Sequence, residues 1–204
     1  FAEPADALEA ADLPAPEAGP GEVLVRIEAV GLARGDWLIT RGLPYMARPM
    51  YGIRTPKQQI AGQVLAGSVE SSGPGVTRFA EGDEVFGWAT ATLGEFASVP
   101  ADKLAPKPEG VTFEQAAAVP VSGFAALQAV RDQGEVTAGQ RVLVIGASGG
   151  VGSLATQIAV SLGSVVTGVA GPSNLQMVRD LGAAEEIDST NAEIDDRGPV
   201  FDEI

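Results

Sequence analysis

The sequence predicts a protein of two domains, a β-rich domain followed by an α/β domain with a parallel sheet. Three observations predict this fold class. Short strand-like segments alternate with Gly and Pro turns up to about residue 105, a β-α-β-α order begins at residue 141, and a glycine-rich stretch separates its first strand from its first helix. We expect the two domains to cover residues 1–115 and 116–204.

The first domain is expected to be built from short strands. Partial alternation of polar and apolar residues indicates a strand at residues 22–30, and two glycines, Gly62 and Gly67, interrupt an apolar stretch at residues 60–70. A glycine inside a strand indicates a bulge or a close approach of two backbones. Further strands are expected at residues 84–88, 94–99 and 103–104, so a small barrel or sandwich is predicted.

The second domain is expected to alternate strands and helices. Thr112 is suited to cap a helix whose first turn holds Glu114 and Gln115, and Pro120 interrupts that helix. A short β-branched run at residues 141–145 is typical of a strand buried in a parallel sheet. The other expected elements are helices at residues 122–133, 152–162 and 173–181, and strands at residues 165–170, 186–188 and 200–204.

The composition excludes several kinds of site. The chain has no Cys and no His, which excludes zinc held by thiolates or imidazoles, Ser-His-Asp triads and Cys-His pairs. Its 13 Lys and Arg against 27 Asp and Glu give a net charge of −14, which argues against nucleic-acid binding. No apolar run reaches the ~18 residues of a membrane span and no signal peptide is visible, so we expect a cytoplasmic protein without a membrane partner.

One segment reverses the acidic character of the chain. Residues 34–57 contain five basic residues and a single acid, Asp36. A basic segment in an acidic protein is suited to steer an anionic ligand, and its alternative interpretation, as a solvated loop, is favoured. Both interpretations stay open at the level of sequence.

The glycine-rich stretch carries the main functional signal. It follows a buried strand, opens a helix and is followed by a second strand, which is the context of a dinucleotide-binding loop. Glycines permit a tight turn there, and the helix N-terminus directs free N–H groups at a pyrophosphate. The alternative is a glycine-rich helix start without a ligand. The candidate cofactor-binding residues of this loop are Gly146, Ser148, Gly149, Gly150, Val151 and Gly152.

The end of the second parallel strand indicates the type of cofactor. NAD-binding proteins usually place Asp or Glu there to hold the ribose hydroxyls, whereas residues 169–174 contain no acid. Ser173 and Asn174 are suited to donate hydrogen bonds to a 2′-phosphate, so NADPH is favoured over NADH. Ser173 has a second interpretation as the N-cap of the next helix, and Arg179 is read as a solvated helix residue.

Five segments together carry a resemblance to a known family: residues 21–27, 34–37, 73–85, 116–120 and 146–152. On these residues the chain resembles the medium-chain dehydrogenase/reductase superfamily, in its zinc-independent quinone oxidoreductase-like or zinc-less alcohol dehydrogenase-like branch. The resemblance implies a GroES-like β-barrel catalytic domain followed by a Rossmann domain, with an active site between them. It also implies a homodimer for the full-length protein.

The resemblance implies an NADPH-dependent oxidoreductase that transfers hydride to a quinone, enone or carbonyl without zinc. Zinc-dependent relatives carry Cys and His where Ala33 and Gln63 stand, so no metal ligand is expected. Hydride transfer proceeds without a metal because the cofactor supplies the chemistry. Tyr45 stands where relatives carry a cleft-lining tyrosine, and it is the candidate catalytic residue, with a packing or surface role as its alternative.

Three departures from the family pattern favour a different function. Relatives often carry Asn, Asp and Thr where Ala33, Val64 and Ala125 stand, and each replacement removes a polar group. Ser122 is expected to compensate partly for the last loss as a further cofactor-binding residue. The alternatives are therefore a nucleotide-binding or interaction protein without catalysis, or an inactive fragment that folds only with a partner.

The length of the chain also bears on its function. A Rossmann sheet has six strands, and the chain ends near the start of the fourth, so we expect it to be the N-terminal piece of a longer protein. The first residue is Phe1 and not Met, and we expect an initial strand to be missing.

Overall fold

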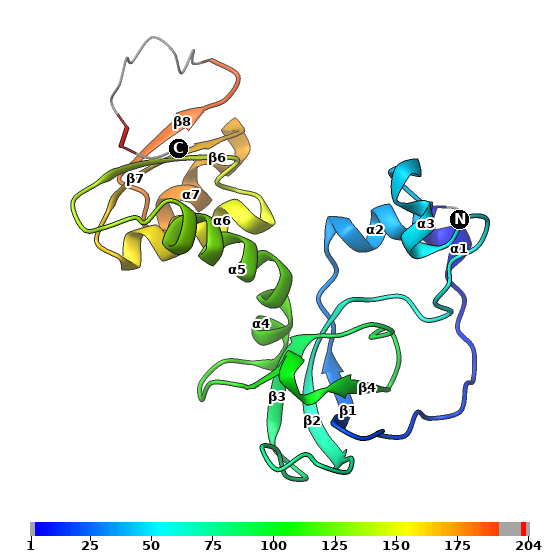
Figure 1. The fold of residues 1–204 in the computed structure, drawn as a ribbon. Helices are drawn as coiled ribbons and strands as arrows, with labels where there is room; N and C mark the ends of the chain where they lie inside the picture. The colour runs from blue at the N-terminus through cyan, green and yellow to red at the C-terminus, as the bar shows by residue number, and fades with distance from the viewer. Residues whose placement is uncertain (1–2, 192–200, 203–204) are drawn as a thin grey trace. The chain divides into compact units, whose positions relative to one another are not determined.

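The computed structural model describes residues 3–191 and 201–202 (Figure 1). The chain divides into two compact units, Phe1–Val121 and Ser122–Ile204. The expected fold class is confirmed, since the first unit holds an antiparallel β-sheet and the second holds a parallel sheet with helices between its strands. The domain boundary at residues 115 and 116 stays a prediction.

The first unit is built on one five-stranded sheet. Its strands are β1 (Glu22–Ala29), β2 (Val64–Ser72), β3 (Glu84–Trp88), β4 (Phe96–Pro100) and β5 (Leu104–Pro106). They pair antiparallel in the order β4-β1-β2-β3-β5. A short 3₁₀ turn, η2 (Ala101–Lys103), joins the last two strands. All five predicted strand segments are confirmed, β3 with the predicted bounds and the other four with shifted ends.

The central pair of strands explains one of the strand glycines. Val25 on β1 lies opposite Val69 on β2, and both side chains are buried in the core of the unit. Beside them, a Cβ atom on Gly67 would lie 2.0 Å from the carbonyl oxygen of Arg26. Gly67 therefore lets the β1 backbone approach closely, as the sequence predicts for a glycine at this place.

The basic segment is largely helical up to Tyr51, so its interpretation as a loop is wrong there, whereas residues 52–57 are irregular. It forms α2 (Arg34–Arg41), the 3₁₀ turn η1 (Tyr45–Ala47) and α3 (Arg48–Tyr51). At the start of α2 the Asp36 carboxylate accepts the Ala33 N–H at 2.9 Å, which satisfies an N–H group that the helix leaves free. A further short helix, α1 (Pro4–Ala7), contacts α2.

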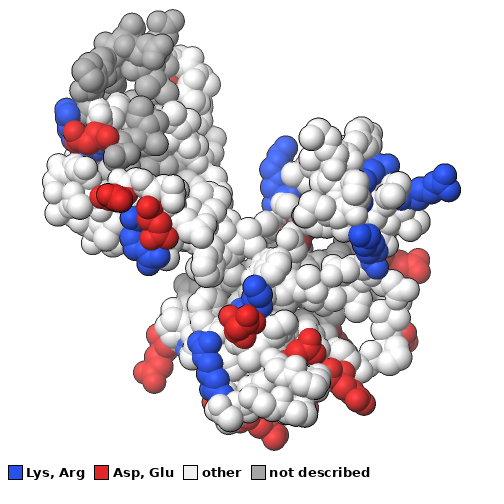
Figure 2. All heavy atoms as spheres, in the orientation of Figure 1, with Lys and Arg blue, Asp and Glu red and all other residues white. Residues whose placement is uncertain are grey.

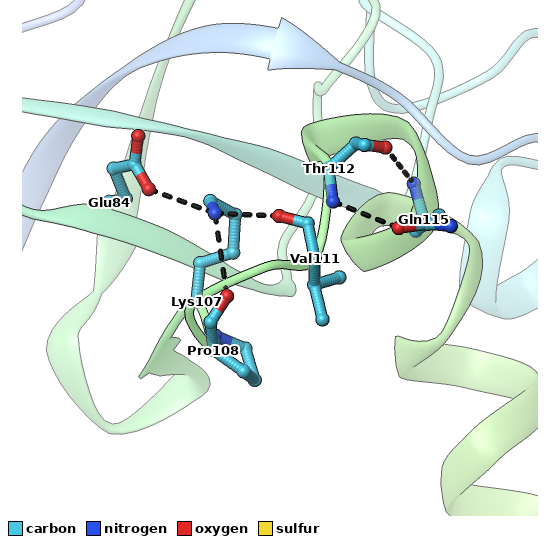
Figure 3. Close-up of polar contacts among 6 residues, drawn as sticks. All are labelled: Glu84, Lys107, Pro108, Val111, Thr112 and Gln115. Atoms are coloured by element: carbon cyan, nitrogen blue, oxygen red, sulfur yellow. Dashed lines mark hydrogen bonds and ion pairs between the residues drawn. The ribbon is translucent and has the colours of Figure 1, made fainter.

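The link from the sheet to the next helix is held by a buried lysine (Figure 3). The Lys107 ammonium donates to the carbonyl oxygen of Val111 at 2.7 Å and pairs with Glu84 at 2.9 Å, and its side chain is only 8% exposed. Helix α4 (Phe113–Ala118) then begins at Thr112, whose hydroxyl accepts the Gln115 N–H while the Gln115 side chain accepts the Thr112 N–H. The predicted cap is confirmed as a reciprocal pair.

The second unit is a three-stranded parallel sheet. Strands β6 (Arg141–Ile145), β7 (Val165–Ala170) and β8 (Glu185–Asp188) pair in that order. Helix α6 (Gly150–Ser161) joins β6 to β7, and α7 (Leu175–Asp180) follows β7. This is the predicted β-α-β-α order with its third strand.

The two faces of this sheet bury different residues, because side chains alternate along a strand. Val142 and Val144 of β6 join Val178 of α7 in one apolar core. Leu143 points to the other face, where it packs with Val169, Ile187 and the partly buried Phe201. Both helices thus cover one side of the sheet.

Several predicted boundaries differ in detail. The helix expected at residues 122–133 is α5 (Pro120–Leu127) continued by a π-helical turn, η3 (Gln128–Gln133). Pro120 starts α5, where its missing N–H costs no hydrogen bond. The helix expected at residues 173–181 is a 3₁₀ turn, η4 (Pro172–Asn174), followed by α7.

Only part of the expected fourth strand, residues 200–204, lies within the described residues. Phe201 and Asp202 are not in a strand. Asp202 nevertheless attaches to the edge of β6, where its N–H donates to the Arg141 carbonyl at 2.9 Å and its carboxylate accepts the Arg141 N–H at 2.8 Å.

Candidate cofactor-binding site

The glycine-rich loop joins β6 to α6 in a tight, defined turn. Gly146 has φ = 77°, a left-handed conformation that favours glycine. The N–H groups of Gly146 and Ala147 both donate to the Val169 carbonyl on β7, at 3.0 and 2.9 Å. The Gly149 N–H donates to the Gly146 carbonyl at 2.9 Å, so the loop is held by its own backbone and by the neighbouring strand.

The last glycine of the loop is required by close packing. A Cβ atom on Gly152 would lie 2.2 Å from the Gly146 carbonyl oxygen and 3.0 Å from the Cα of Ala147. By contrast, a Cβ atom on Gly146 would meet nothing within 4 Å, so the loop is open on that side. Backbone packs on one side of the turn and space remains on the other, which suits a dinucleotide pyrophosphate.

The start of α6 is electrostatically suited to an anion. Its N-cap is Gly149, and no side chain caps the helix. The first-turn N–H groups, on Gly150, Val151 and Gly152, have no partner within the helix, and the helix dipole places partial positive charge beside them. These are the groups that bind phosphate at a helix N-terminus.

Two polar side chains proposed for the cofactor meet at this loop. The Asn174 amide donates to the Ser148 hydroxyl at 3.4 Å, which links η4 to the glycine loop. Ser173 is exposed and lies inside η4, whose N-cap is Gly171, while the N-cap of α7 is Asn174. The interpretation of Ser173 as the cap of the following helix is therefore wrong.

The nearby cation already has a partner. Arg179 forms an ion pair with Glu186 at the start of β8. Its side chain is 58% exposed, in agreement with its interpretation as a solvated helix residue, and it is held on that acid. Ser173 and Asn174 are left as the polar candidates for an adenosine phosphate at the end of β7.

Ser122 lies against the start of α6. A Cβ atom on Gly150 would be 3.2 Å from the Ser122 hydroxyl oxygen. The structure therefore brings a hydroxyl group to the first turn of the helix, as the resemblance implies, although Ser122 is 28 residues earlier in the chain. Ala125, three residues later on α5, is exposed.

Tyr45 belongs to the first unit and is described there by itself. It opens η1, its side chain is 70% exposed, and the Arg48 guanidinium lies 4.6 Å from the centre of its ring. An exposed phenol is available to a ligand, and the catalytic role of Tyr45 stays a prediction.

Sequence reasoning missed the role of Asp36. Its buried carboxylate accepts the Ala33 N–H at 2.9 Å and the Gln63 side-chain amide at 3.2 Å. The two positions expected to replace metal ligands thus meet at one carboxylate. Within residues 3–191 and 201–202, no group of three or more His, Cys, Asp or Glu is placed to hold a metal ion. The signal in the sequence was an acid at the third position of a helix.

Val64 is buried in the first unit, and Asp188, which the sequence analysis did not single out, lies at the edge of the parallel sheet of the second unit. Val64 is 4% exposed, and its side chain would lie 2.8 Å from a Cβ atom on Gly31, so it fills a packed position. Asp188 ends β8 beside Ala170, at the carboxyl edge of the sheet where ligands bind in this fold class. Donation from the Thr190 N–H and hydroxyl, and from the Asn191 amide, lowers the pKa of Asp188.

Comparison with known proteins shows which family the chain resembles. Residues 19–109 match the alcohol dehydrogenase GroES-like domain. The chain is 36% identical over 193 residues to a quinone oxidoreductase of Pseudomonas aeruginosa. This match covers 93% of this chain and 57% of that protein. The chain is similar to quinone oxidoreductases and other members of the medium-chain dehydrogenase/reductase superfamily. The expected resemblance is confirmed, and the relatives of this chain include quinone oxidoreductases.

Two more relatives show how much of a longer protein the chain represents. It is 40% identical over 164 residues to the pikromycin polyketide synthase component PikAII of Streptomyces venezuelae, over 80% of this chain and 4% of that protein. The structure of the Escherichia coli quinone oxidoreductase complexed with NADPH matches with a TM-score of 0.79 and 27% identity, over 92% of this chain and 56% of that one. The chain spans little more than half the length of the quinone oxidoreductases.

Within the described part of the chain, no helix has the length and apolar character that crossing a membrane requires.

Proposed function

We propose that the protein containing this chain is an NADPH-dependent reductase that transfers hydride to a quinone, enone or carbonyl without zinc. The observation that carries this proposal is the turn from β6 into α6, because its open glycine and uncapped helix start fit a pyrophosphate. The quinone oxidoreductase relatives support the reaction class. In the same proposal the longer protein forms a homodimer.

The preference for NADPH rests on the end of β7. No carboxylate lies between Ala170 and Asn174, so a 2′-phosphate meets no repulsion from this stretch. The hydroxyl of Ser173 is exposed, and the Asn174 amide is already oriented toward the glycine loop by Ser148. Donors of this type favour the phosphorylated cofactor.

The residues of the chain have the following roles in this reaction. The bound nicotinamide supplies the hydride. The N–H groups of Gly150, Val151 and Gly152 hold the pyrophosphate, and the Ser122 hydroxyl lines the start of the same helix. The Tyr45 hydroxyl donates a hydrogen bond to the substrate oxygen as negative charge develops there, which is the role a metal plays in zinc enzymes.

A nucleotide titration of the full-length protein tests the proposal. We expect NADPH to raise the melting temperature, with stabilisation of about 2.7 kcal/mol at a concentration 100 times its Kd, and NADH to do so only at higher concentration. If neither nucleotide shifts the melting curve, the reductase proposal fails. If NADH binds more tightly, only the cofactor preference fails.

A second function is favoured by the packing of Val64. Because Val64 is buried and apolar, it presents no polar group to a ligand, and Ala33 offers only its backbone. A nucleotide-binding or interaction protein without catalysis is consistent with these losses. It predicts a shift of the melting curve by NADPH together with no oxidation of NADPH over a panel of quinones and enones.

A further inference from the structure

The segment at residues 34–57, hereafter the basic lobe, differs in charge from the rest of the chain. It holds five of the 13 Lys and Arg of the sequence but only one of the 27 Asp and Glu. That one acid, Asp36, is buried and engaged by Ala33 and Gln63. All exposed charge on the basic lobe is therefore positive, and Figure 2 shows Lys and Arg spaced around uncharged surface over α2 and α3.

Three of these cations are open to an anion. Arg34 is exposed, and its guanidinium lies 5.5 Å from the centre of the Trp37 ring. Lys57 is exposed and donates one hydrogen bond, to the Pro49 carbonyl at 3.0 Å, out of the three an ammonium can donate. Arg54 is exposed and makes no hydrogen bond or ion pair to any residue that the structure describes.

The other two cations have partners. Arg41 pairs with Glu3 at 2.9 Å, which shows that the basic lobe accepts a carboxylate. The Arg48 side chain donates to the Gly42 carbonyl and lies over the Tyr45 ring. These two residues shape the basic lobe and are not counted as binding groups.

Apolar side chains stand between the cations. Tyr45 is 70% exposed, Met46 91%, Met50 70% and Ile53 69%. Apolar side chains gathered on an exposed surface mark a binding site more often than isolated ones do, and methionine adapts to ligands of varied shape. The basic lobe therefore carries exposed apolar side chains that alternate along the sequence with its guanidinium and ammonium groups.

We propose, building on the reductase activity proposed above, that the substrate carries a phosphate or carboxylate on an apolar body, and that the basic lobe binds it. Tyr45 and its apolar neighbours would contact the body, while Arg34, Arg54 and Lys57 bind the anionic group. Arginine suits this role because its planar fork matches the oxygens of phosphate and carboxylate. The positive lobe would also draw an anion toward a chain whose net charge repels it.

A matched set of thioesters tests this inference in the full-length protein. The first probe is the 2-hexenoyl thioester of pantetheine, which is neutral. The second probe carries a phosphate on the terminal hydroxyl of pantetheine, and the third carries a succinyl group there, which ends in a carboxylate. We expect kcat/KM for NADPH-dependent reduction to be about tenfold higher for the phosphorylated or succinylated probe than for the neutral one, since one charge-assisted hydrogen bond accounts for such a factor. The larger of the two effects identifies the anion.

Trp37 provides a separate readout of binding. The chain has two tryptophans, and Trp88 is on β3, so a W88F variant leaves Trp37 as the only indole of the described units. An anion at Arg34 should change Trp37 emission, and added salt should weaken the effect. If W88F does not fold, calorimetry of the unaltered protein replaces this readout.

The variants decide between the outcomes. R54Q/K57Q should lose the preference for the anionic probes, about tenfold, while R78Q, an exposed Arg on another turn of the same unit, should keep it. Equal reduction of all three thioesters by every variant overturns the anionic substrate and leaves the reductase proposal standing. Anion binding that depends on Arg54 and Lys57 without any turnover overturns the reductase proposal and retains the basic lobe as an anion site.

Discussion

The packing of Gly152 leads to a quantitative prediction for G152A. The new Cβ atom would lie 2.2 Å from the Gly146 carbonyl oxygen, whereas such contacts essentially never fall below 3.0 Å, so backbone must move by about 0.8 Å. The surrounding atoms, including the Gly146 carbonyl carbon at 2.8 Å, are also backbone and cannot turn away as a side chain would. The strain therefore falls on the turn itself.

Two opposing terms set the size of the effect. Overpacking of a close contact costs about 1–3 kcal/mol, while replacing a helical glycine by alanine returns about 0.5–1 kcal/mol. We expect a net loss of about 1–2 kcal/mol in the free energy of unfolding of the second unit. Displacing the N–H groups that face the pyrophosphate should lower NADPH affinity about 10- to 100-fold, because hydrogen bonds to charged groups contribute about 1.5–3 kcal/mol.

The assay must report on the second unit. Both tryptophans and both tyrosines lie in the first unit, so hydrogen exchange of the β6 and α6 amides is the appropriate measure, together with NADPH titration by calorimetry. G94A is the matched control, because a Cβ atom there would meet only the Phe96 carbonyl at 3.8 Å. Unchanged amide protection and unchanged NADPH affinity in G152A would refute the packing argument.

Two further predictions concern stability. T112A removes the hydroxyl that accepts the Gln115 N–H and should lower the free energy of unfolding, measured in urea, by about 1 kcal/mol. T112S keeps a hydroxyl and should retain most of that stability. An equal loss of stability in both variants would contradict the capping role. Hydrogen-bond donors at Thr190 and Asn191 lower the pKa of Asp188. The ionised carboxylate therefore stabilises the folded state at neutral pH. This contribution is lost as the pH falls below about 4 toward the lowered pKa. The difference in unfolding free energy between the wild type and D188N should therefore shrink on acidification, and a constant difference down to pH 2 would disprove the assignment.

Features encoded by short-range patterns could be predicted from the sequence. The reciprocal cap of Thr112 and Gln115 depends on residues three apart, and the β6 strand, glycine loop and α6 helix follow one another directly. Local backbone sterics and hydrogen bonding determine such elements, so their order in the chain is enough. The family resemblance rests on the same local motifs.

Contacts between distant residues could not be predicted in this way. Asp36 and Gln63 are 27 residues apart, and only the folded first unit brings the carboxylate and the amide within 3.2 Å. The helical form of the basic segment was missed for a related reason, since its cations and turn residues read as a solvated loop. Similarly, Arg179 acquires Glu186 as its partner only because α7 packs beside β8.

The sequence by itself thus determined the class of each unit, the glycine-rich turn between β6 and α6 and the lack of Cys and His ligands, because these follow from residue types and their spacing. The tertiary structure decided which polar groups are left for ligands. It assigns Arg179 to Glu186 and Asp36 to Gln63, and it leaves Arg54 and Lys57 exposed on the basic lobe. The physical reason is that a charged side chain is available to a ligand only when folding has not already placed a partner beside it.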